Sequence, residues 1–274
     1  MIKVRQIKVS ILKDTKEELI KKISKKINEK YIEIIKINKK SIDARDKENI
    51  FYVYEVIIKV NDENKIKFSN DVLKYEEEKY EYKITGKKKM NERPIIVGSG
   101  PSGLFIGYML SINGYRPIII ERGQCIEQRV KTVEKFFEDN ILNKNSNIQF
   151  GEGGAGTFSD GKLNTLKKDK EFRQKKVFEI FVECGAPKEI LYSNKPHIGT
   201  DILRKVIINM RNKIINFGGE IRYNTCLTNL IIKANKIEGV EINHKEIIKT
   251  NNLILALGNS SRDTFEMLFN NGLN

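Results

Sequence analysis

Three glycines at a fixed spacing are the first residues whose types and positions suggest chemistry. Gly98, Gly100 and Gly103 follow a short apolar run and precede a helix-like stretch. At this spacing the first glycine permits a tight turn, the second lets backbone approach a pyrophosphate, and the third lets helix and strand pack closely. The first turn of the helix favours an anion. The turn also includes Ser99, Pro101 and Ser102. Glycine turns also occur for packing alone, so the context must decide.

A carboxylate supplies that context. The apolar run from Pro117 to Ile120 ends in Glu121, about 20 residues beyond the first glycine, where such a group accepts the hydroxyl hydrogens of an adenosine ribose. Its charge would repel a 2′-phosphate, which favours FAD or NAD over NADP. Arg122 follows directly and is assigned to the same cofactor site.

A second glycine-rich stretch runs from Phe150 to Leu163, with five glycines in the eleven residues 151–161. This composition excludes a regular helix or a packed strand interior. One interpretation is a flexible surface loop. The other is a ligand loop whose backbone donors hold a diphosphate and whose hydroxyls bond ribityl or flavin atoms. Its predicted cofactor-binding residues are Gly153, Gly154, Ala155, Gly156, Thr157, Ser159, Asp160, Gly161 and Lys162.

Length and composition limit the remaining possibilities. A chain of 274 residues can form two domains, predicted at 1–90 and 91–274. The apolar runs are too short to span a membrane, and three scattered cysteines argue against disulfides, zinc or a dithiol pair, so we expect a cytoplasmic protein without a metal site. The net charge of +14 is spread along the chain, which favours a solvated lysine surface over a dedicated polyanion site, although nucleic acid remains an alternative partner.

The first domain is predicted to be a small α+β domain of the ferredoxin-like kind. Thr15 is the expected N-cap of a helix that ends near Asn28, with Glu18 completing a capping box. Alternating apolar residues predict the strands 2–11, 31–37, 50–60 and 80–84, with a charged connection at 39–47 and a linker at 87–91.

The second domain is predicted to be an α/β, Rossmann-like FAD/NAD(P)-binding domain with a β-meander. Helices are expected at 126–140, 171–184 and from Thr200 or Asp201 to 217, and the meander at 220–224, 227–233 and 236–242. A returning strand, 252–257, ends at Gly258, which lets the chain pass close to a cofactor. His197 is expected to be a packed histidine, with a role beside the cofactor as the alternative.

Taken together, the motifs resemble the large, mostly uncharacterised family of bacterial FAD-dependent dehydrogenases, a branch of the glutathione-reductase-like flavoproteins. The segments that carry the resemblance are 41–45, 98–103, 150–163, 195–200 and 256–265. The resemblance implies a non-covalent FAD held by the two glycine motifs and Glu121. It also implies an adenine edge paired with backbone near Cys226 and Leu227, and NAD(P)H as the candidate electron donor.

The chain departs from that family in length. Family members run on to roughly twice this length, so we expect an incomplete chain that lacks the substrate domain and the final strand over the flavin. The leading hypothesis is an FAD-dependent oxidoreductase of unassigned substrate, in which the flavin carries the hydride chemistry. The alternatives are a flavoprotein that acts on RNA and a non-catalytic truncated remnant. No side chain is assigned as acid, base or nucleophile.

Overall fold

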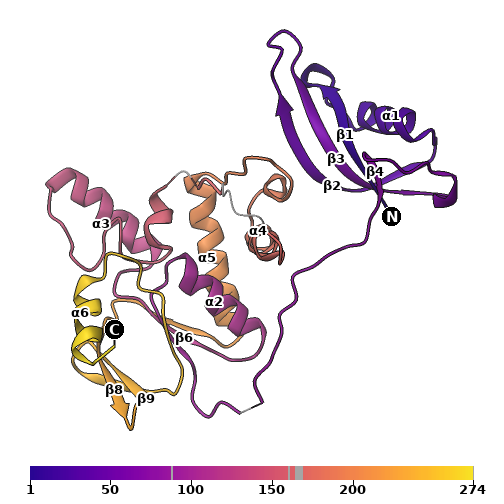
Figure 1. The fold of residues 1–274 in the computed structure, drawn as a ribbon. Helices are drawn as coiled ribbons and strands as arrows, with labels where there is room; N and C mark the ends of the chain where they lie inside the picture. The colour runs from indigo at the N-terminus through magenta and orange to yellow at the C-terminus, as the bar shows by residue number, and fades with distance from the viewer. Residues whose placement is uncertain (88, 160, 164–168, 274) are drawn as a thin grey trace. The chain divides into compact units, whose positions relative to one another are not determined.

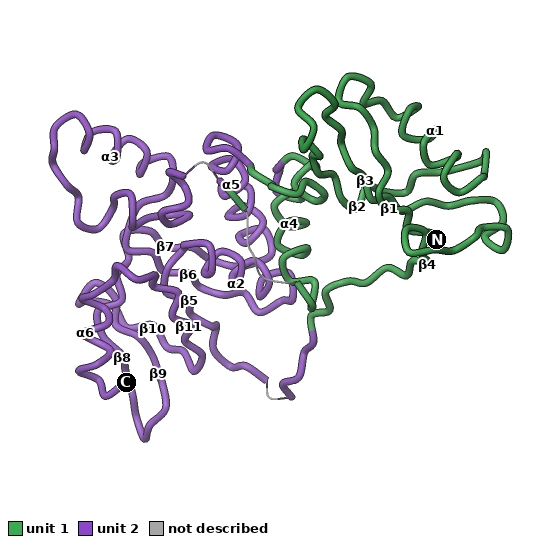
Figure 2. Tube along the Cα trace, turned by 45° about the horizontal axis from the view of Figure 1, so that its top comes forward, with its two compact units in different colours: residues 1–82, 162–183, 187–197 green, residues 83–161, 184–186, 198–274 purple. Residues whose placement is uncertain are grey.

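The computed structural model describes residues 1–87, 89–159, 161–163 and 169–273 of this mixed α/β protein. The chain divides into two compact units, coloured separately in Figure 2: residues 1–82, 162–183 and 187–197, and residues 83–161, 184–186 and 198–274. The first unit therefore takes in two segments from the middle of the chain as well as its beginning. The domain boundary near residue 90 stays a prediction. None of the described helices has the length and apolar composition needed to cross a membrane.

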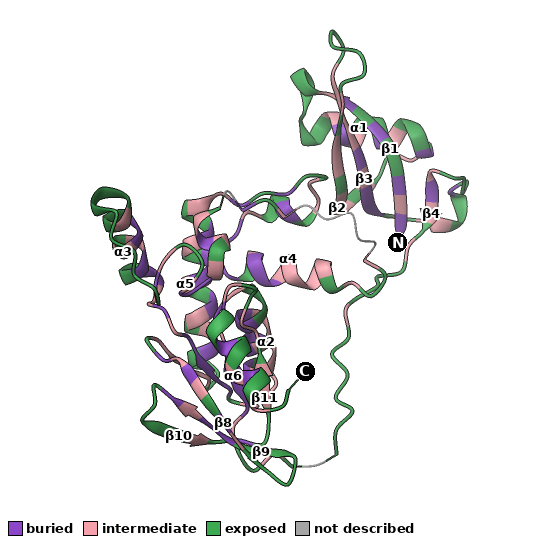
Figure 3. Cartoon of the chain, turned by 60° about the vertical axis from the view of Figure 1, so that its left-hand side comes forward, coloured by how far each residue is buried: buried purple, intermediate pink, exposed green. Residues whose placement is uncertain are grey.

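The first unit is built on an antiparallel sheet of four strands in the order β2-β3-β1-β4 (Figure 1). The strands are β1 (Ile2–Ser10), β2 (Ile32–Asp43), β3 (Phe51–Val60) and β4 (Val72–Lys74), with short 3₁₀ turns at Ile11–Lys13 and Glu63–Lys65. Every second residue of β1 and β3 packs with helix α1 (Lys16–Ile27) in one core, except at a bulge between Val4 and Ile7. Figure 3 shows buried segments in both strands. The two-residue period of a half-buried strand explains this alternation.

Helix α1 begins where the sequence predicts. The Thr15 side chain accepts a hydrogen bond of 3.2 Å from the backbone N–H of Glu18, and Asn28 ends the helix in the left-handed conformation at φ 55°. Leu19, Ile23 and Ile27 lie on the buried face. One helical stripe of apolar residues thus closes the core of the first unit.

Two predictions for the first unit are wrong. Strand β2 continues through 39–43, which had been assigned to a charged connection, because its residues pair with β3 as far as Asp43. The run 80–84 forms no strand, and the fourth strand is β4 instead, which pairs with the start of β1. A strand of three residues gives too short an alternation to be recognised.

The middle segments of the first unit extend the sheet edge. Helix α4 (Arg173–Glu183) and the 3₁₀ turn Lys188–Leu191 lead into a stretch that pairs with edge strand β2. The N–H of Lys40 donates to the carbonyl of Tyr192 at 2.8 Å, and the N–H of Asn194 donates to the carbonyl of Lys40 at 3.0 Å. This pairing satisfies backbone groups that an edge strand otherwise leaves open. His197 is exposed, so the prediction of a packed histidine is wrong.

The second unit contains a parallel sheet in the order β11-β5-β6-β7. Its strands are β5 (Ile95–Val97), β6 (Ile118–Ile120), β7 (Glu220–Arg222) and β11 (Leu253–Leu255). Helix α2 (Pro101–Ile112) connects β5 to β6 and packs, with α5 (Thr200–Asn216), on one face of the sheet, where Gly107 lies against Ile119 and Ile214. Gly199, not Thr200 or Asp201, occupies the N-cap position of α5.

The other face of the parallel sheet is covered by an antiparallel sheet in the order β10-β9-β8 and by α6 (Arg262–Asn270). Its strands are β8 (Leu227–Lys233), β9 (Lys236–Ile242) and β10 (Glu246–Lys249). The predicted runs 227–233 and 236–242 are confirmed, with Ala234 and Asn235 both at positive φ in the turn. The run 220–224 was expected in the meander, but β7 pairs with β6 in the parallel sheet.

The buried face of helix α3 (Ile126–Asp139) agrees only in part with its apolar pattern, which predicts packing through residues 130, 133, 136 and 137. Val133 is buried as predicted, together with Ile126 and Arg129, whereas Phe137 is 67% exposed. A buried arginine replaces an apolar side chain in this stripe. Its partners are in the second glycine-rich stretch.

Candidate functional site

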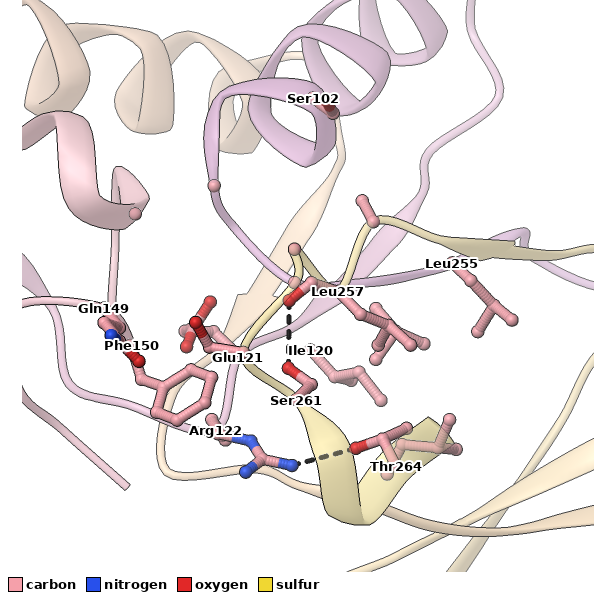
Figure 4. Close-up of a pocket in the computed structure, with 18 of the residues that line it drawn as sticks. Ser102, Ile120, Glu121, Arg122, Gln149, Phe150, Leu255, Leu257, Ser261 and Thr264 are labelled. Carbon is pink, nitrogen blue, oxygen red and sulfur yellow. Dashed lines mark hydrogen bonds between the residues drawn. The ribbon is translucent and has the colours of Figure 1, made fainter. Parts of the chain in front are cut away.

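A cavity of about 640 Å³ opens at the carboxyl ends of strands β5, β6 and β11 (Figure 4). Its walls come from five places in the sequence: the turn after β5, the residues after β6, the second glycine-rich stretch, the start of β8, and the segment from β11 into α6. All five belong to the second compact unit. The described lining of the cavity therefore comes from a single unit.

The strand order explains why the cavity lies here. From β5 the chain moves through α2 to β6 on one side, whereas β11 pairs with the opposite side of β5. The connections that leave β5 and β11 consequently diverge to opposite sides and leave a crevice between them. In open α/β sheets, ligands bind in such a crevice, outside the carboxyl ends of the strands.

The three glycines of the turn after β5 have different surroundings. Gly98 has φ 100°, and a methyl carbon on it would lie 2.5 Å from the Ala256 carbonyl oxygen. A methyl carbon on Gly103 would overlap the carbonyl oxygen of Gly98, so this glycine allows helix and strand to approach. A methyl carbon on Gly100 meets nothing within 4 Å, and Gly100 lines the cavity.

Among the described residues, no side chain caps the N-terminus of helix α2, which lies at the cavity. Gly100 is its N-cap and has no side chain that can accept from the first-turn N–H groups, and Pro101 and Ser102 line the cavity beside it. Free N–H groups at a helix start, together with the helix dipole, make an anion site. The residues present therefore fit a diphosphate placed against Gly100.

Glu121 lies at the centre of three loops and is 5% exposed. One carboxylate oxygen accepts from the N–H and the hydroxyl of Ser99, at 2.8 and 2.9 Å. The other accepts from the N–H of Gly123 at 2.9 Å and from the N–H of Gly151 at 3.1 Å. A carboxylate has about four acceptor positions, so protein donors already occupy them. Contact of Glu121 with a ribose stays a prediction that requires one of these donors to be replaced.

Arg122 joins the opposite walls of the cavity. Its Nη2 donates to both carboxylate oxygens of Asp263, at 3.0 and 2.9 Å, and to the hydroxyl of Thr264 at 2.9 Å. The guanidinium carbon lies 4.7 Å from the centre of the Phe150 ring, and Figure 4 shows the two side chains next to each other. Burial acts to raise the pKa of the Asp263 carboxyl, but the hydrogen bond and charge of Arg122 and the backbone hydrogen bonds together outweigh it, and the pKa is lowered.

Cys226 completes this wall. Its sulfur lies 3.5 Å from Nη2 of Arg122, and it lines the cavity. Burial raises the pKa of the Cys226 thiol. The thiol is therefore neutral at pH 7 and a weak nucleophile.

Two residues that the motifs did not reveal hold the second glycine-rich stretch. Arg129 is 0% exposed and donates to the carbonyls of four residues at 2.6 to 2.9 Å: Asn147, Ile148, Glu152 and Gly154. Burial lowers the pKa of its guanidinium to about 10, which leaves it charged at pH 7. Its position in an amphipathic helix gives no sequence signal for this role.

Glu152 is the second of these residues and is also fully buried. It accepts from the N–H of Ile126 and from Nη1 of Arg211, each at 2.9 Å, while its other oxygen has no hydrogen-bond partner among the described residues. Burial raises the pKa of the Glu152 carboxyl. This side chain ties the glycine-rich stretch to α3 and α5.

The structure brings about half of the predicted site residues together around the cavity. Those that line it are Gly98, Gly100, Pro101, Ser102, Glu121, Arg122, Gly154, Ala155, Leu227 and Gly258. The lining does not include Ser99, Gly103, Gly153, Gly156, Thr157, Ser159 or Gly161, which belong to the same unit. Lys162 belongs to the first unit, and Asp160 lies outside the described residues. Phe150 and Cys226, which the sequence analysis expects near the ligand, also line the cavity, and Thr264 lines it without having been predicted.

Fold and cavity together define a mixed α/β protein with a ligand-sized cavity at the strand-order reversal of a parallel sheet. A family model described as a domain of unknown function (DUF8436) matches residues 1–59. An uncharacterized protein of Clostridium beijerinckii (strain ATCC 51743 / NCIMB 8052) is 41% identical over 273 residues, which cover 98% of this chain and 50% of that protein. The chain thus spans about half the length of this curated relative.

Solved structures to which the chain shows some similarity include the following three. THI4 of Thermovibrio ammonificans has 17% identity and a TM-score of 0.44, over 67% of this chain and 64% of its own. Glycine oxidase of Bacillus cereus ATCC 14579 has 13% identity and a TM-score of 0.44, over 66% and 59%. OTEMO in complex with FAD and NADP has 14% identity and a TM-score of 0.38, over 62% and 26%. At these scores the likeness carries no functional argument.

Proposed function

We propose that this chain binds FAD non-covalently in the cavity of its second unit and belongs to an FAD-dependent oxidoreductase. The observation that carries the proposal is the uncapped N-terminus of α2, with Gly100 open to a cavity at the strand-order reversal. This combination is the Rossmann-like arrangement for a dinucleotide diphosphate. FAD, when bound, supplies hydride transfer.

The residues of the chain would hold the nucleotide half of the cofactor. N–H groups of the first turn of α2 would bind the diphosphate, with Gly154 and Ala155 forming the facing wall. Backbone at Cys226 and Leu227 would meet the adenine, and Gly258 would let the chain after β11 pass close to the cofactor. A substrate, and NAD(P)H as the electron donor, would bind to the longer protein of which this chain would form a part.

We also propose that the first unit is a ferredoxin-like domain. Its strand order, β2-β3-β1-β4, with α1 between β1 and β2, supports this assignment. A 3₁₀ turn takes the place of a second helix between β3 and β4. The fold alone assigns no activity to this unit.

Competition between ligands tests the FAD proposal. FAD fluorescence is titrated with the purified chain, and ADP or riboflavin is then added in excess. We expect ADP to displace FAD, because both carry the adenosine diphosphate group that the α2 terminus would bind, and riboflavin to displace it much less. Absence of both FAD and ADP binding would overturn the proposal, and displacement by riboflavin alone would place the flavin ring, not the diphosphate, in the cavity.

A further inference from the structure

The second glycine-rich stretch is held from two directions by buried charges. Glu121 accepts from the N–H of Gly151 at 3.1 Å. Arg129 lies against the same glycine, because a methyl carbon on Gly151 would overlap the Arg129 side chain. The peptide at Gly151 therefore runs between a carboxylate and a guanidinium. Gly151 has φ 118°, a conformation that side chains other than glycine rarely adopt.

The two charges bind different backbone groups. Glu121 collects N–H donors from the turn after β5, from the residue after Arg122, and from Gly151. Arg129 collects carbonyl acceptors on both sides of Gly151, at residues 147, 148, 152 and 154. Backbone donors thus go to the anion and backbone acceptors to the cation. The Glu121 carboxylate acts to raise the pKa of the Arg129 guanidinium, against the larger lowering by burial.

We propose that Glu121 and Arg129 act as a coupled pair of positioning residues that forms the cavity wall at Gly151–Ala155 before any ligand binds. This inference rests on the proposed function for its ligand, but the loop geometry stands without it. The pair fixes the turn through the peptide between them. A cavity with a preformed wall binds its ligand without the entropic cost of ordering that loop.

The electrostatic consequence is specific. Both side chains are buried charges, and Glu121 acts together with Glu152 to raise the pKa of Arg129. Removing one therefore leaves the other with less opposite charge around it, which costs more than replacing both. Glu121→Gln and Arg129→Met should each weaken ADP binding. The double variant should bind ADP about tenfold more tightly than the product of the two single effects predicts. If the two residues acted independently, the loss of ADP affinity in the double variant would equal the product of the two single losses.

A half-buried pair of the same chemistry provides the control. Arg93 donates to the Glu220 carboxylate at 2.7 Å and to the carbonyls of Arg116 and Pro117, at the opposite ends of the strands from the cavity. Glu220→Gln and Arg93→Met should leave ADP affinity within about twofold of the unsubstituted chain. This control separates an effect on the cavity wall from a general loss of stability.

A second readout needs no nucleotide. The stretch 147–159 contains Phe150 and Phe158, at which chymotrypsin cuts, and the cuts can be mapped by mass spectrometry. Glu121→Gln and Arg129→Met should each speed cleavage at these two positions at least about fivefold. In the double variant the cleavage rate should rise by less than the product of the two single increases. The Arg93 and Glu220 variants should not change it. If Arg129→Met does not fold, Arg129→Lys takes its place and should be partly protected, because it keeps the charge but not the four bonds.

The outcomes separate the two proposals. If the unsubstituted chain binds neither ADP nor FAD, the proposed function fails while the chymotrypsin comparison still decides the positioning role. If cleavage at Phe150 and Phe158 is unchanged in both single variants, or the effects multiply independently, the coupled pair is refuted even when FAD binds.

Discussion

Gly100→Ala should separate ligand binding from folding. The added methyl group meets nothing within 4 Å, and the backbone at φ −66° and ψ −178° is one that alanine adopts. Alanine is a poorer N-cap than glycine, but it also reduces the freedom of the unfolded chain. These effects oppose each other, so the free energy of unfolding should change by less than about 1 kcal/mol.

The same methyl group enters the space where the diphosphate would meet the start of α2. A hydrogen bond to a charged group contributes about 1.5–3 kcal/mol, so losing one through displacement of the phosphate weakens binding by about tenfold to 150-fold. The assay is FAD titration by flavin fluorescence, combined with urea unfolding of the ligand-free chain. We expect a large loss of FAD affinity and a small change in the free energy of unfolding.

Two comparison variants make the result decisive. A methyl group on Gly103 would overlap the carbonyl oxygen of Gly98, so Gly103→Ala should lower the free energy of unfolding by about 1–3 kcal/mol through overpacking. Gly86 also meets nothing within 4 Å and lies outside the cavity lining, so Gly86→Ala should change neither quantity. Unchanged FAD affinity in Gly100→Ala, with affinity measurable in the unsubstituted chain, would refute the placement of the diphosphate.

Three further predictions concern other parts of the chain. Bound FAD should slow alkylation of Cys226, which lines the cavity, at least about fivefold. Cys184 is 1% exposed and should be unreactive with or without FAD. Peptide mass mapping measures the labelling of both thiols, and equal labelling of Cys226 with and without FAD would contradict the site. The hydrogen bond from Arg211 lowers the pKa of the Glu127 carboxyl to about 2, so the stabilisation from this pair is present above the unfolded pKa of about 4.5 and is lost as the pH falls from there through 2. Glu127→Gln should therefore lower the free energy of unfolding in urea at pH 6 but not at pH 2, and by less than about 1 kcal/mol because Glu127 is half exposed. An equal difference at both pH values would disprove this assignment. Thr15→Ala should cost the first unit about 1 kcal/mol of unfolding free energy by removing the cap of α1, and a circular dichroism melt identical to that of the unsubstituted chain would show that the cap does not contribute.

Local rules predict much of this fold because they depend on neighbours in the sequence. The cap at Thr15, the turn at Ala234 and Asn235, and the glycine turn at Gly98 each follow from backbone requirements of a few residues. The placement of the cavity followed from the same turn, because a glycine turn between strand and helix fixes where the strand ends.

The remaining features depend on contacts between distant residues. Arg129 reads as a solvent-facing residue of an amphipathic helix, and only the fold brings its guanidinium to carbonyls 18 to 25 residues away. The four donors to Glu121 belong to Ser99, Gly123 and Gly151. Because Ser99 and Gly151 are more than 20 residues from Glu121, the sequence predicts a carboxylate that binds a ribose and not one already occupied by protein donors. The pairing of Lys40 with Tyr192 joins segments about 150 residues apart, for which no periodic pattern exists.

The most direct test of the central claim is the visible absorption spectrum of the purified chain before and after addition of FAD, followed by gel filtration to remove free flavin. We predict that flavin bands stay with the protein at about one FAD per chain, and that they are lost in Gly100→Val. A chain that folds, as judged by circular dichroism, but elutes colourless after incubation with excess FAD would contradict the account.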